Sequence, residues 1–159
     1  LSPFSHAHIH AQTDSWLYIF YGRRGDDSKI SARIQNTDNI REKYWGSIET
    51  IVNRNVTGKR LFFKKGKNSS LHFHCNKKET YYIHSGKLLV RLRAGRGEDQ
   101  FFTLGAGSTL FIPPGLMHQD GGLEDTVIIE ISTHDEDSDS FIVEDGEKYM
   151  MPSLQSRIS

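Results

Sequence analysis

The chain has 159 residues, which is the size of one domain with a single hydrophobic core. Its 20 Lys and Arg residues balance its 20 Asp and Glu residues, so no overall charge attracts nucleic acid or an anionic membrane surface. We therefore expect a small-molecule partner, with no nucleic acid and no membrane among the binding partners.

No apolar run approaches the 18 residues of a membrane span, and the sequence does not open with a basic segment followed by an apolar one. We therefore expect neither a membrane span nor a secretory signal. The single cysteine, Cys75, excludes an intrachain disulfide and favours a reducing compartment. Together these features predict a cytoplasmic protein.

Residues 1–40 are interpreted as an N-terminal extension that contains a pair of strands. Residues 16–21 form an aromatic and apolar run, residues 22–27 have the composition of a turn, and Ile30, Ala32 and Ile34 alternate with polar residues. We expect this pair to be an extra layer or edge of the main sheet, or part of a subunit contact. An exposed aromatic run is better buried, which favours a homodimer.

The remainder of the chain predicts an all-β sandwich or barrel. Residues 36–43 form a polar connector, either a short helix or a loop. Strands are predicted at residues 47–51, 59–65, 87–93, 100–104, 109–112, 126–132 and 141–143, because these runs are rich in β-branched and aromatic residues and are separated by turns. In the second of them, Leu61 and Phe63 share one face. No sustained helical periodicity is present.

Between residues 66 and 86 lies a motif with the chemistry of a metal site. His72 and His74 are two residues apart, so on an extended strand both imidazoles point to the same side. Glu79 follows after a short polar segment and could return a carboxylate to the same cation. Imidazole and carboxylate ligands suit a transition metal better than Ca²⁺ or Mg²⁺, which prefer oxygen.

A fourth ligand is predicted from a second motif at residues 107–118. There a strand enters a turn that contains Pro113, Pro114 and Gly115, and His118 follows on the next strand. Such a turn would direct the imidazole of His118 inward. Three imidazoles and the carboxylate of Glu79 would be costly to bury together without a metal.

These two motifs resemble those of the cupins. The chain reads Gly66-(X)5-His72-X-His74-(X)4-Glu79-(X)6-Gly86, followed by Gly107-(X)5-Pro113-X-Gly115-(X)2-His118. The resemblance implies a double-stranded β-helix, or jelly-roll, barrel at residues 41–148, followed by a tail at residues 149–159. It also implies one divalent transition metal (Mn, Fe, Zn, Ni or Co) bound by His72, His74, Glu79 and His118.

Strand alternation selects candidate residues around this metal. Tyr81 should point inward with Glu79, either as a substrate contact or as part of the core, while Tyr82 and His84 should point away. Phe73 and Phe111 are candidates for an apolar lining of the substrate pocket. Glu130 could project into the barrel as a proton-transferring base, or lie outward on an edge strand.

Over residues 43–145 the chain also resembles type II mannose-6-phosphate isomerases. The residues that carry the likeness are Lys43-Tyr-Trp-Gly46, Ser70-Leu71 with His74 and Glu79, and the closing segments 129–132 and 141–145. The resemblance implies isomerisation between an aldose and a ketose, with a base that moves a proton between C1 and C2 while a Lewis acid stabilises the developing charge.

Three departures from that family change the expected substrate. His72 stands where the family has glutamine, Gln119 where it has a basic residue, and Ile142 where it has arginine. Two cationic groups that would hold a phosphate are thus missing, which favours an unphosphorylated sugar or a different acid. D-lyxose isomerase-like cupins use the ligand types found here. Arg91, or Lys59, Arg60, Lys64 and Lys65, could replace the missing cations, although strand charges of this kind are usually solvated.

The sequence therefore leaves three functions open. The first is a metal-dependent aldose–ketose isomerase. The second is an Fe- or Mn-dependent cupin dioxygenase that acts on a small organic substrate, because the same ligands leave positions for O₂ and a chelating molecule. The third is a non-catalytic cupin that binds or senses a sugar. Carboxylates in the pocket would favour the first, and an apolar lining the second.

Overall fold

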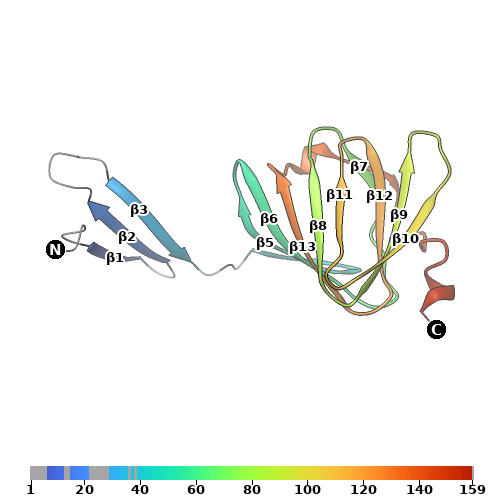
Figure 1. Ribbon diagram of the computed structural model, residues 1–159, viewed down its shortest axis with the longest axis horizontal. Coiled ribbons are helices and arrows are strands. Elements are labelled where there is room, and N and C mark those ends of the chain that lie inside the picture. The colour runs from blue at the N-terminus through green and yellow to red at the C-terminus, as the bar shows by residue number, and fades with distance from the viewer. Residues whose placement is uncertain (1–6, 13–14, 22–28, 36, 38, 159) are drawn as a thin grey trace. The chain divides into compact units, whose positions relative to one another are not determined.

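A computed structural model describes residues 7–12, 15–21, 29–35, 37 and 39–158. The chain separates into two compact units, residues 1–38 and 39–159. The first unit contains an antiparallel sheet of three strands in the order β1-β2-β3, namely β1 (Ala7–Gln12), β2 (Ser15–Tyr21) and β3 (Lys29–Gln35) (Figure 1). β2 and β3 correspond to the predicted pair, but β1 was not predicted. The three strands form a sheet of their own, so they are not a hydrogen-bonded edge of the main sheet.

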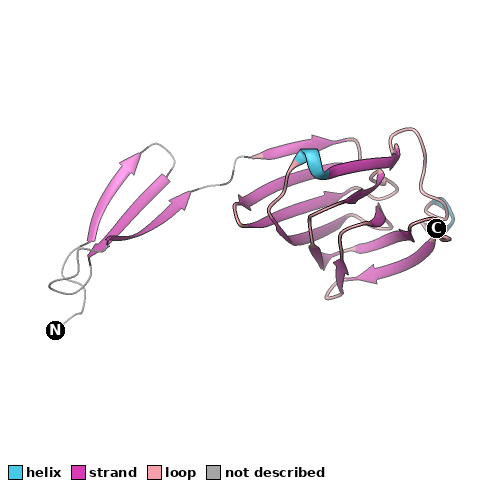
Figure 2. Cartoon of the chain, turned by 90° about the horizontal axis from the view of Figure 1, so that it is seen from above, coloured by secondary structure: helices cyan, strands magenta, loops and turns pink. Residues whose placement is uncertain are grey.

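The second unit consists of two antiparallel sheets (Figure 2). The five-stranded sheet has the order β10-β9-β12-β7-β14, and the six-stranded sheet has the order β11-β8-β13-β6-β5-β4. The strands are β4 (Ile40–Lys43), β5 (Gly46–Asn53), β6 (Val56–Phe63), β7 (Leu71–His74), β8 (Glu79–Ser85), β9 (Lys87–Ala94), β10 (Gln100–Gly105), β11 (Thr109–Ile112), β12 (Leu116–Gly122), β13 (Thr126–Thr133) and β14 (Ser140–Glu144). Neighbouring strands are often far apart in the sequence, as expected for a jelly roll.

Short helical turns are the only helices among the described residues, namely η1 (Asp137–Asp139) and η2 (Gln155–Arg157). No helix in the described part of the chain is long and apolar enough to cross a membrane. The short helix allowed for residues 36–43 is absent from residues 40–43, which instead form β4 and pair with β5. Pairing with β5 therefore makes a strand of a segment whose polar composition alone suggested a short helix or a loop.

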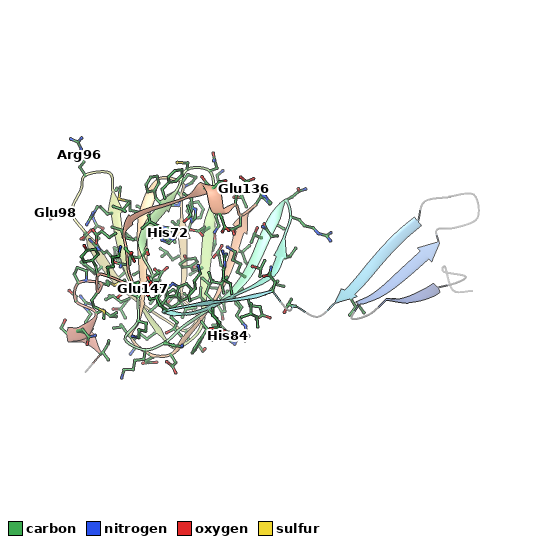
Figure 3. The ribbon with its side chains drawn as sticks, turned by 180° about the vertical axis from the view of Figure 1, so that it is seen from behind. His72, His84, Arg96, Glu98, Glu136 and Glu147 are labelled. Carbon is green, nitrogen blue, oxygen red and sulfur yellow. The ribbon has the colours of Figure 1, made fainter. Side chains whose placement is uncertain are left out.

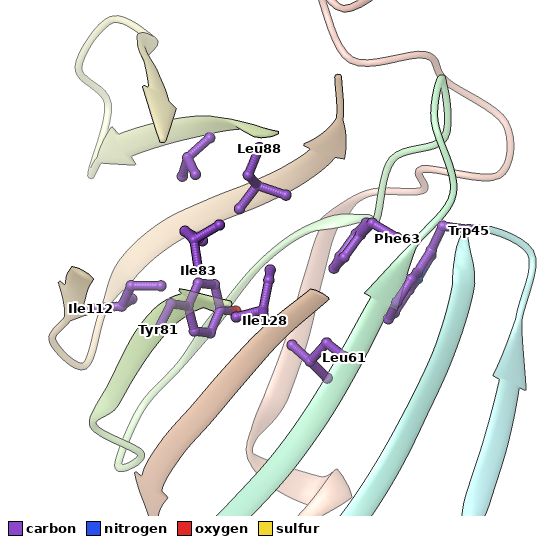
Figure 4. Close-up of a cluster of buried hydrophobic side chains, with 9 residues drawn as sticks. Trp45, Leu61, Phe63, Tyr81, Ile83, Leu88, Ile112 and Ile128 are labelled. Atoms are coloured by element: carbon purple, nitrogen blue, oxygen red, sulfur yellow. The ribbon is translucent and has the colours of Figure 1, made fainter. Parts of the chain in front are cut away.

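Apolar residues of both sheets fill the space between them. On β6, β8 and β13, alternate residues point inward and bury Leu61, Ile83 and Ile128, while β9 contributes Leu88 from the opposite sheet. The rings of Trp45 and Phe63 stack with their centroids 4.2 Å apart. Figure 4 shows these side chains converging from both sheets.

The C-terminal tail covers the outer face of the five-stranded sheet. Met151 and Leu154 are buried against Leu89 and Leu123. Leu89 alternates with the inward-facing Leu88 and therefore lies on the outer side of β9. Elsewhere on the surface, the single cysteine, Cys75, is exposed.

Two glycines, one from each of the predicted motifs, fix tight turns. Gly86 joins β8 to β9 with φ 82°, and a Cβ atom there would lie 2.3 Å from the backbone oxygen of Asp125. Gly115 has φ 80° in the turn that leads into β12, as the second motif predicted. This turn sets the direction in which β12 enters the barrel and thereby places His118.

Candidate metal centre

Three histidines from two neighbouring strands meet inside the barrel. His72 and His74 lie on β7, and His118 on β12 is directly opposite His72 in the pairing of these strands. Their potential ligand atoms all lie within 4.8 Å of one another. His118 is fully buried, His74 is nearly so and His72 is half-buried. Figure 3 labels His72 among the side chains of the barrel.

Each of these imidazoles is oriented by a backbone carbonyl. The Nδ1 atom of His72 lies 2.9 Å from the oxygen of Ser70, that of His74 lies 2.8 Å from the oxygen of Asp139, and that of His118 lies 3.2 Å from the oxygen of Leu116. A carbonyl can only accept a hydrogen bond, so Nδ1 carries the proton in each ring. In the neutral form of each ring, the Nε2 lone pair is then available for a metal.

The local environment also favours neutral rings at two of the positions. Burial lowers the pKa of His72 to about 3, with a further contribution from the nearby His118. Burial likewise lowers the pKa of His74. For His118, burial also opposes the charged form, but the adjacent Glu79 carboxylate outweighs it and raises the pKa. A metal requires the neutral imidazole, which His72 and His74 already provide.

Glu79 lies beside the three histidines. Its Oε2 atom is 3.3 Å from Nε2 of His118, and its Oε1 atom is 3.7 Å from Nε2 of His74. Burial opposes ionisation, but His118, Lys77 and His74 together hold the pKa of Glu79 well below its usual range. The carboxylate is therefore present in the charged form that a cation would bind.

Two buried atoms at this centre lack hydrogen-bond partners among the described residues, namely Nε2 of His118 and Oε2 of Glu79. Leaving such atoms unsatisfied costs about 1–3 kcal/mol each. A divalent cation between them would satisfy both, and the donor set of imidazole nitrogens with one carboxylate oxygen suits a transition metal. The residues present therefore fit the metal that the cupin motifs imply.

A network of buried charges continues from Glu79 along the wall of the barrel. Lys77 Nζ lies 2.5 Å from Glu79, 2.8 Å from Glu130 and 2.8 Å from Asp135. Lys59 Nζ contacts Asp135 at 2.6 Å and lies 3.9 Å from Glu130. Burial opposes the charge on Lys77, but Glu130 and Glu79 outweigh it and raise its pKa. Glu130 projects into the barrel and accepts a hydrogen bond from Ser132 at 3.2 Å.

Sequence reasoning did not single out Lys77. It left two alternatives for Lys59, a replacement for a missing cation of the pocket or a solvated strand charge, and the second is wrong because only 5% of the residue is exposed. The signal for Lys59 was present: it shares its side of β6 with Leu61 and Phe63, which were predicted to face together.

Beside these groups lies a cavity of about 490 Å³. Its lining combines charged residues with aromatic and apolar ones, including Trp45 and Leu61. Eight carboxylates face four cationic side chains there, a formal excess of four negative charges. The carboxylates are Glu79, Asp120, Glu130, Asp135, Glu136, Asp137, Asp145 and Glu147, and the cations are Arg41, Lys43, Lys59 and Lys77. Figure 3 labels Glu136 and Glu147 of this set.

Asp120 is a further buried carboxylate of the cavity that sequence reasoning did not identify. The hydroxyl of Tyr81 donates a hydrogen bond to its Oδ2 atom at 3.3 Å, whereas its Oδ1 atom has no partner among the described residues. Burial raises the pKa of Asp120 to about 6. Its position two residues after His118 on β12 gives it the same inward direction, and this spacing was the available signal.

The other predicted substrate residues divide into two groups. Tyr81 and Glu130 line the cavity, whereas Phe73, Phe111 and Arg91 do not. Phe73 alternates with His72 and His74, so it faces outward and stacks on Phe141 with ring centroids 5.3 Å apart. Phe111 is 58% exposed on the surface.

Arg91 lies on the outer face of the five-stranded sheet, opposite Gln119 on β12. Its guanidinium contacts Glu144 at 2.6 Å and Asp99 at 2.7 Å, and it donates a hydrogen bond to Gln119 at 3.0 Å. Its neighbours in the chain point the other way, into the core, because side chains alternate along β9. Arg91 therefore cannot take the place of a phosphate-binding cation in the cavity.

Comparison with known proteins identifies the fold. No protein-family model matches the chain, and no curated protein matches it. Among solved structures, oxalate decarboxylase from Bacillus subtilis is 20% identical, with 69% of this chain and 32% of that chain covered and a TM-score of 0.59. The capsular polysaccharide assembling protein CapF from Staphylococcus aureus is 22% identical, with 66% and 31% covered and a TM-score of 0.57.

The chain thus spans about a third of the length of these structures. At such low identity the likeness concerns the fold alone. It confirms the predicted all-β, cupin-type jelly roll, inside which the three histidines could hold a metal.

Proposed function

We propose that this protein is a metal-dependent cupin that acts on a sugar or sugar derivative by aldose–ketose isomerisation. The observation that carries the proposal is the carboxylate-rich cavity next to the histidine centre. The two phenylalanines expected in an apolar pocket, Phe73 and Phe111, are not among its lining residues. Apolar side chains such as Trp45, Leu61 and Phe63 contribute to the lining as well, but its eight carboxylates suit a molecule with many hydroxyl groups better than a wholly apolar substrate.

The isomerisation requires a proton to leave one carbon of the sugar and return to its neighbour. A divalent metal at the histidine centre supplies a Lewis acid for the oxygen atoms of the substrate. Within the chain, Glu130 is the proposed base, because it is buried and lines the cavity. Lys77 and Ser132 hold its Oε1 atom at 2.8 Å and 3.2 Å, which fixes the orientation of the carboxylate.

The charge of the cavity supports an unphosphorylated substrate. A phosphate needs cationic groups that are free to bind it, and bidentate arginine is the usual choice. Here Lys59 is engaged by Asp135, Lys77 by Glu79, and Arg41 by Asp137 at 3.3 Å, so that among the four cations of the lining only Lys43 has no ion pair within the described part of the chain. The excess of negative charge would repel a phosphate group further.

A screen of free and phosphorylated aldoses tests the proposal. The protein is reconstituted with Mn, Fe, Co, Ni or Zn, and each sugar is supplied with and without oxygen. We expect conversion of a free pentose or hexose to its ketose under anaerobic conditions, and slower or no conversion of the phosphate ester. Oxygen consumption on addition of substrate would instead indicate a dioxygenase. Tight binding of sugar without turnover would indicate a binding or sensing protein.

A further inference from the structure

The carboxylate of Asp120 has one oxygen atom that the protein leaves unsatisfied. The residue is 2% exposed and lines the cavity, and its Oδ1 atom has no hydrogen-bond partner among the described residues. An ionised carboxylate can only accept hydrogen bonds. A partner for this oxygen would have to be a donor, and the cavity that Asp120 lines is the side from which we expect one to approach.

The rest of the residue is held firmly. Its backbone N–H donates to Oγ of Ser69 at 3.0 Å, and its Oδ2 atom accepts the hydrogen bond from the buried hydroxyl of Tyr81. These contacts orient the side chain so that Oδ1 is the atom left for a ligand. Such a preorganised acceptor discriminates strongly between a ligand that carries a donor and one that does not.

We propose that Asp120 is a substrate-binding residue that accepts a hydrogen bond from an uncharged hydroxyl group of the substrate, while the metal centre holds another part of the same molecule. The inference rests on the proposed function, and it specifies the substrate as a polyol chain without an anionic group at this end. An anionic end would place its charge beside Asp120 and Glu79, which line the same cavity.

Spacing along β12 makes simultaneous contact feasible. His118 and Asp120 are two residues apart on one strand and face the same side. Their Cα atoms are therefore separated by about 6.8 Å, a span that an acyclic chain of a few carbon atoms covers. Asp120 would thus fix the position of the sugar along the cavity, and its role is recognition of the substrate instead of proton transfer.

The test compares two probes that differ at one end of the chain. Xylitol has a hydroxyl group at every carbon and no carbonyl group to react, and xylonate carries a carboxylate in place of one terminal alcohol. Binding of each is measured by calorimetry at pH 8 on the 159-residue protein reconstituted with Mn. We expect the wild-type protein to bind xylitol more tightly than xylonate.

Asp120→Asn preserves the size of the side chain but can present an amide donor where the carboxylate presents an acceptor. We expect this variant to bind xylitol roughly 10- to 100-fold more weakly, which is the effect of losing a hydrogen bond to a charged group. The preference of the protein for xylitol over xylonate should become smaller or reverse. Glu124→Gln removes a charge at an exposed position outside the cavity and should leave both affinities unchanged. Metal content is measured in every sample and should not differ.

Asp120→Ser serves as a second variant, because its short side chain fits without strain and should cause the same loss of xylitol binding. Unchanged xylitol affinity in a folded, metal-loaded Asp120 variant would overturn the role of Asp120 while leaving the isomerase proposal standing. Failure of the wild-type protein to bind any polyol would overturn the proposed function and this inference together.

Discussion

The Nζ atom of Lys77 lies 2.5 Å from Oε1 of Glu79, so the carboxylate beside the histidine centre is bound by a buried ammonium group. The other oxygen of Glu79 faces His118. Through Lys77, Glu79 is connected to Glu130 and Asp135 in the cavity. The metal centre and the substrate cavity are therefore parts of one electrostatic network, in which a change at one group alters the balance of charge at the others.

Removal of Lys77 tests the strength of this network. In Lys77→Met, three carboxylates lose their shared cation, and we expect the free energy of unfolding to fall by about 3–5 kcal/mol. Urea denaturation measures this change. Lys78→Met alters an exposed neighbour and should have an effect of less than about 0.5 kcal/mol. Similar midpoints for the two variants would contradict a structural role for the network.

Stability in acid should depend on Asp135. Although burial opposes ionisation, hydrogen bonds from Lys59 and Lys77 lower the pKa of Asp135 from 3.8 to about 2. The folded state therefore binds this proton less readily than the unfolded state, so the stabilisation is complete above about pH 4 and is lost as the pH falls towards 2. Urea midpoints measured across this range should decline less steeply for Asp135→Asn than for the wild type. An equal slope would show that Asp135 makes no such contribution. The control is Glu98→Gln, on the exposed turn between β9 and β10, and its urea midpoints should decline as steeply as those of the wild type.

The turn at Gly86 should not tolerate a side chain. Gly86→Ala would place Cβ 2.3 Å from the backbone oxygen of Asp125 at a positive φ, so the backbone would have to move. Gly95 also has a positive φ, but no atom lies within 4 Å of the Cβ atom that an alanine would add there. Gly95→Ala should therefore lower the free energy of unfolding by only about 1 kcal/mol. We expect Gly86→Ala to be less stable than Gly95→Ala by at least about 2 kcal/mol in thermal or urea unfolding. Equal stability would contradict the tight packing of this turn.

Much of the barrel could be predicted from the sequence because strand alternation and turn residues are local signals. Because side chains alternate between the two sides of a strand, the sequence predicts which side of the sheet Leu61, Tyr81 and Tyr82 face. The prolines and the glycine before β12 likewise predict the turn at Gly115. β4 could not be predicted in this way, because four largely polar residues become a strand only through pairing with β5.

The cavity was harder to predict because its charges are compensated in three dimensions. Lys59 and Lys77 resemble solvated residues in the sequence, and they are buried only because Glu130 and Asp135, distant in the chain, lie against them. Phe73 and Phe111 were assigned to the pocket for their apolar character, although alternation places Phe73 opposite to His72 and His74. Spacing along a strand was a better guide to the site than residue type.

The metal content of the purified protein tests the central claim most directly. We expect about one first-row transition metal per chain in the wild type, measured by inductively coupled plasma mass spectrometry after dialysis, and loss of most of it in His74→Ala and in His118→Ala. The control is His84→Ala, which removes an exposed imidazole from the other face of β8 and should keep its metal. Full retention of the metal by both His74→Ala and His118→Ala would contradict a metal centre at this site.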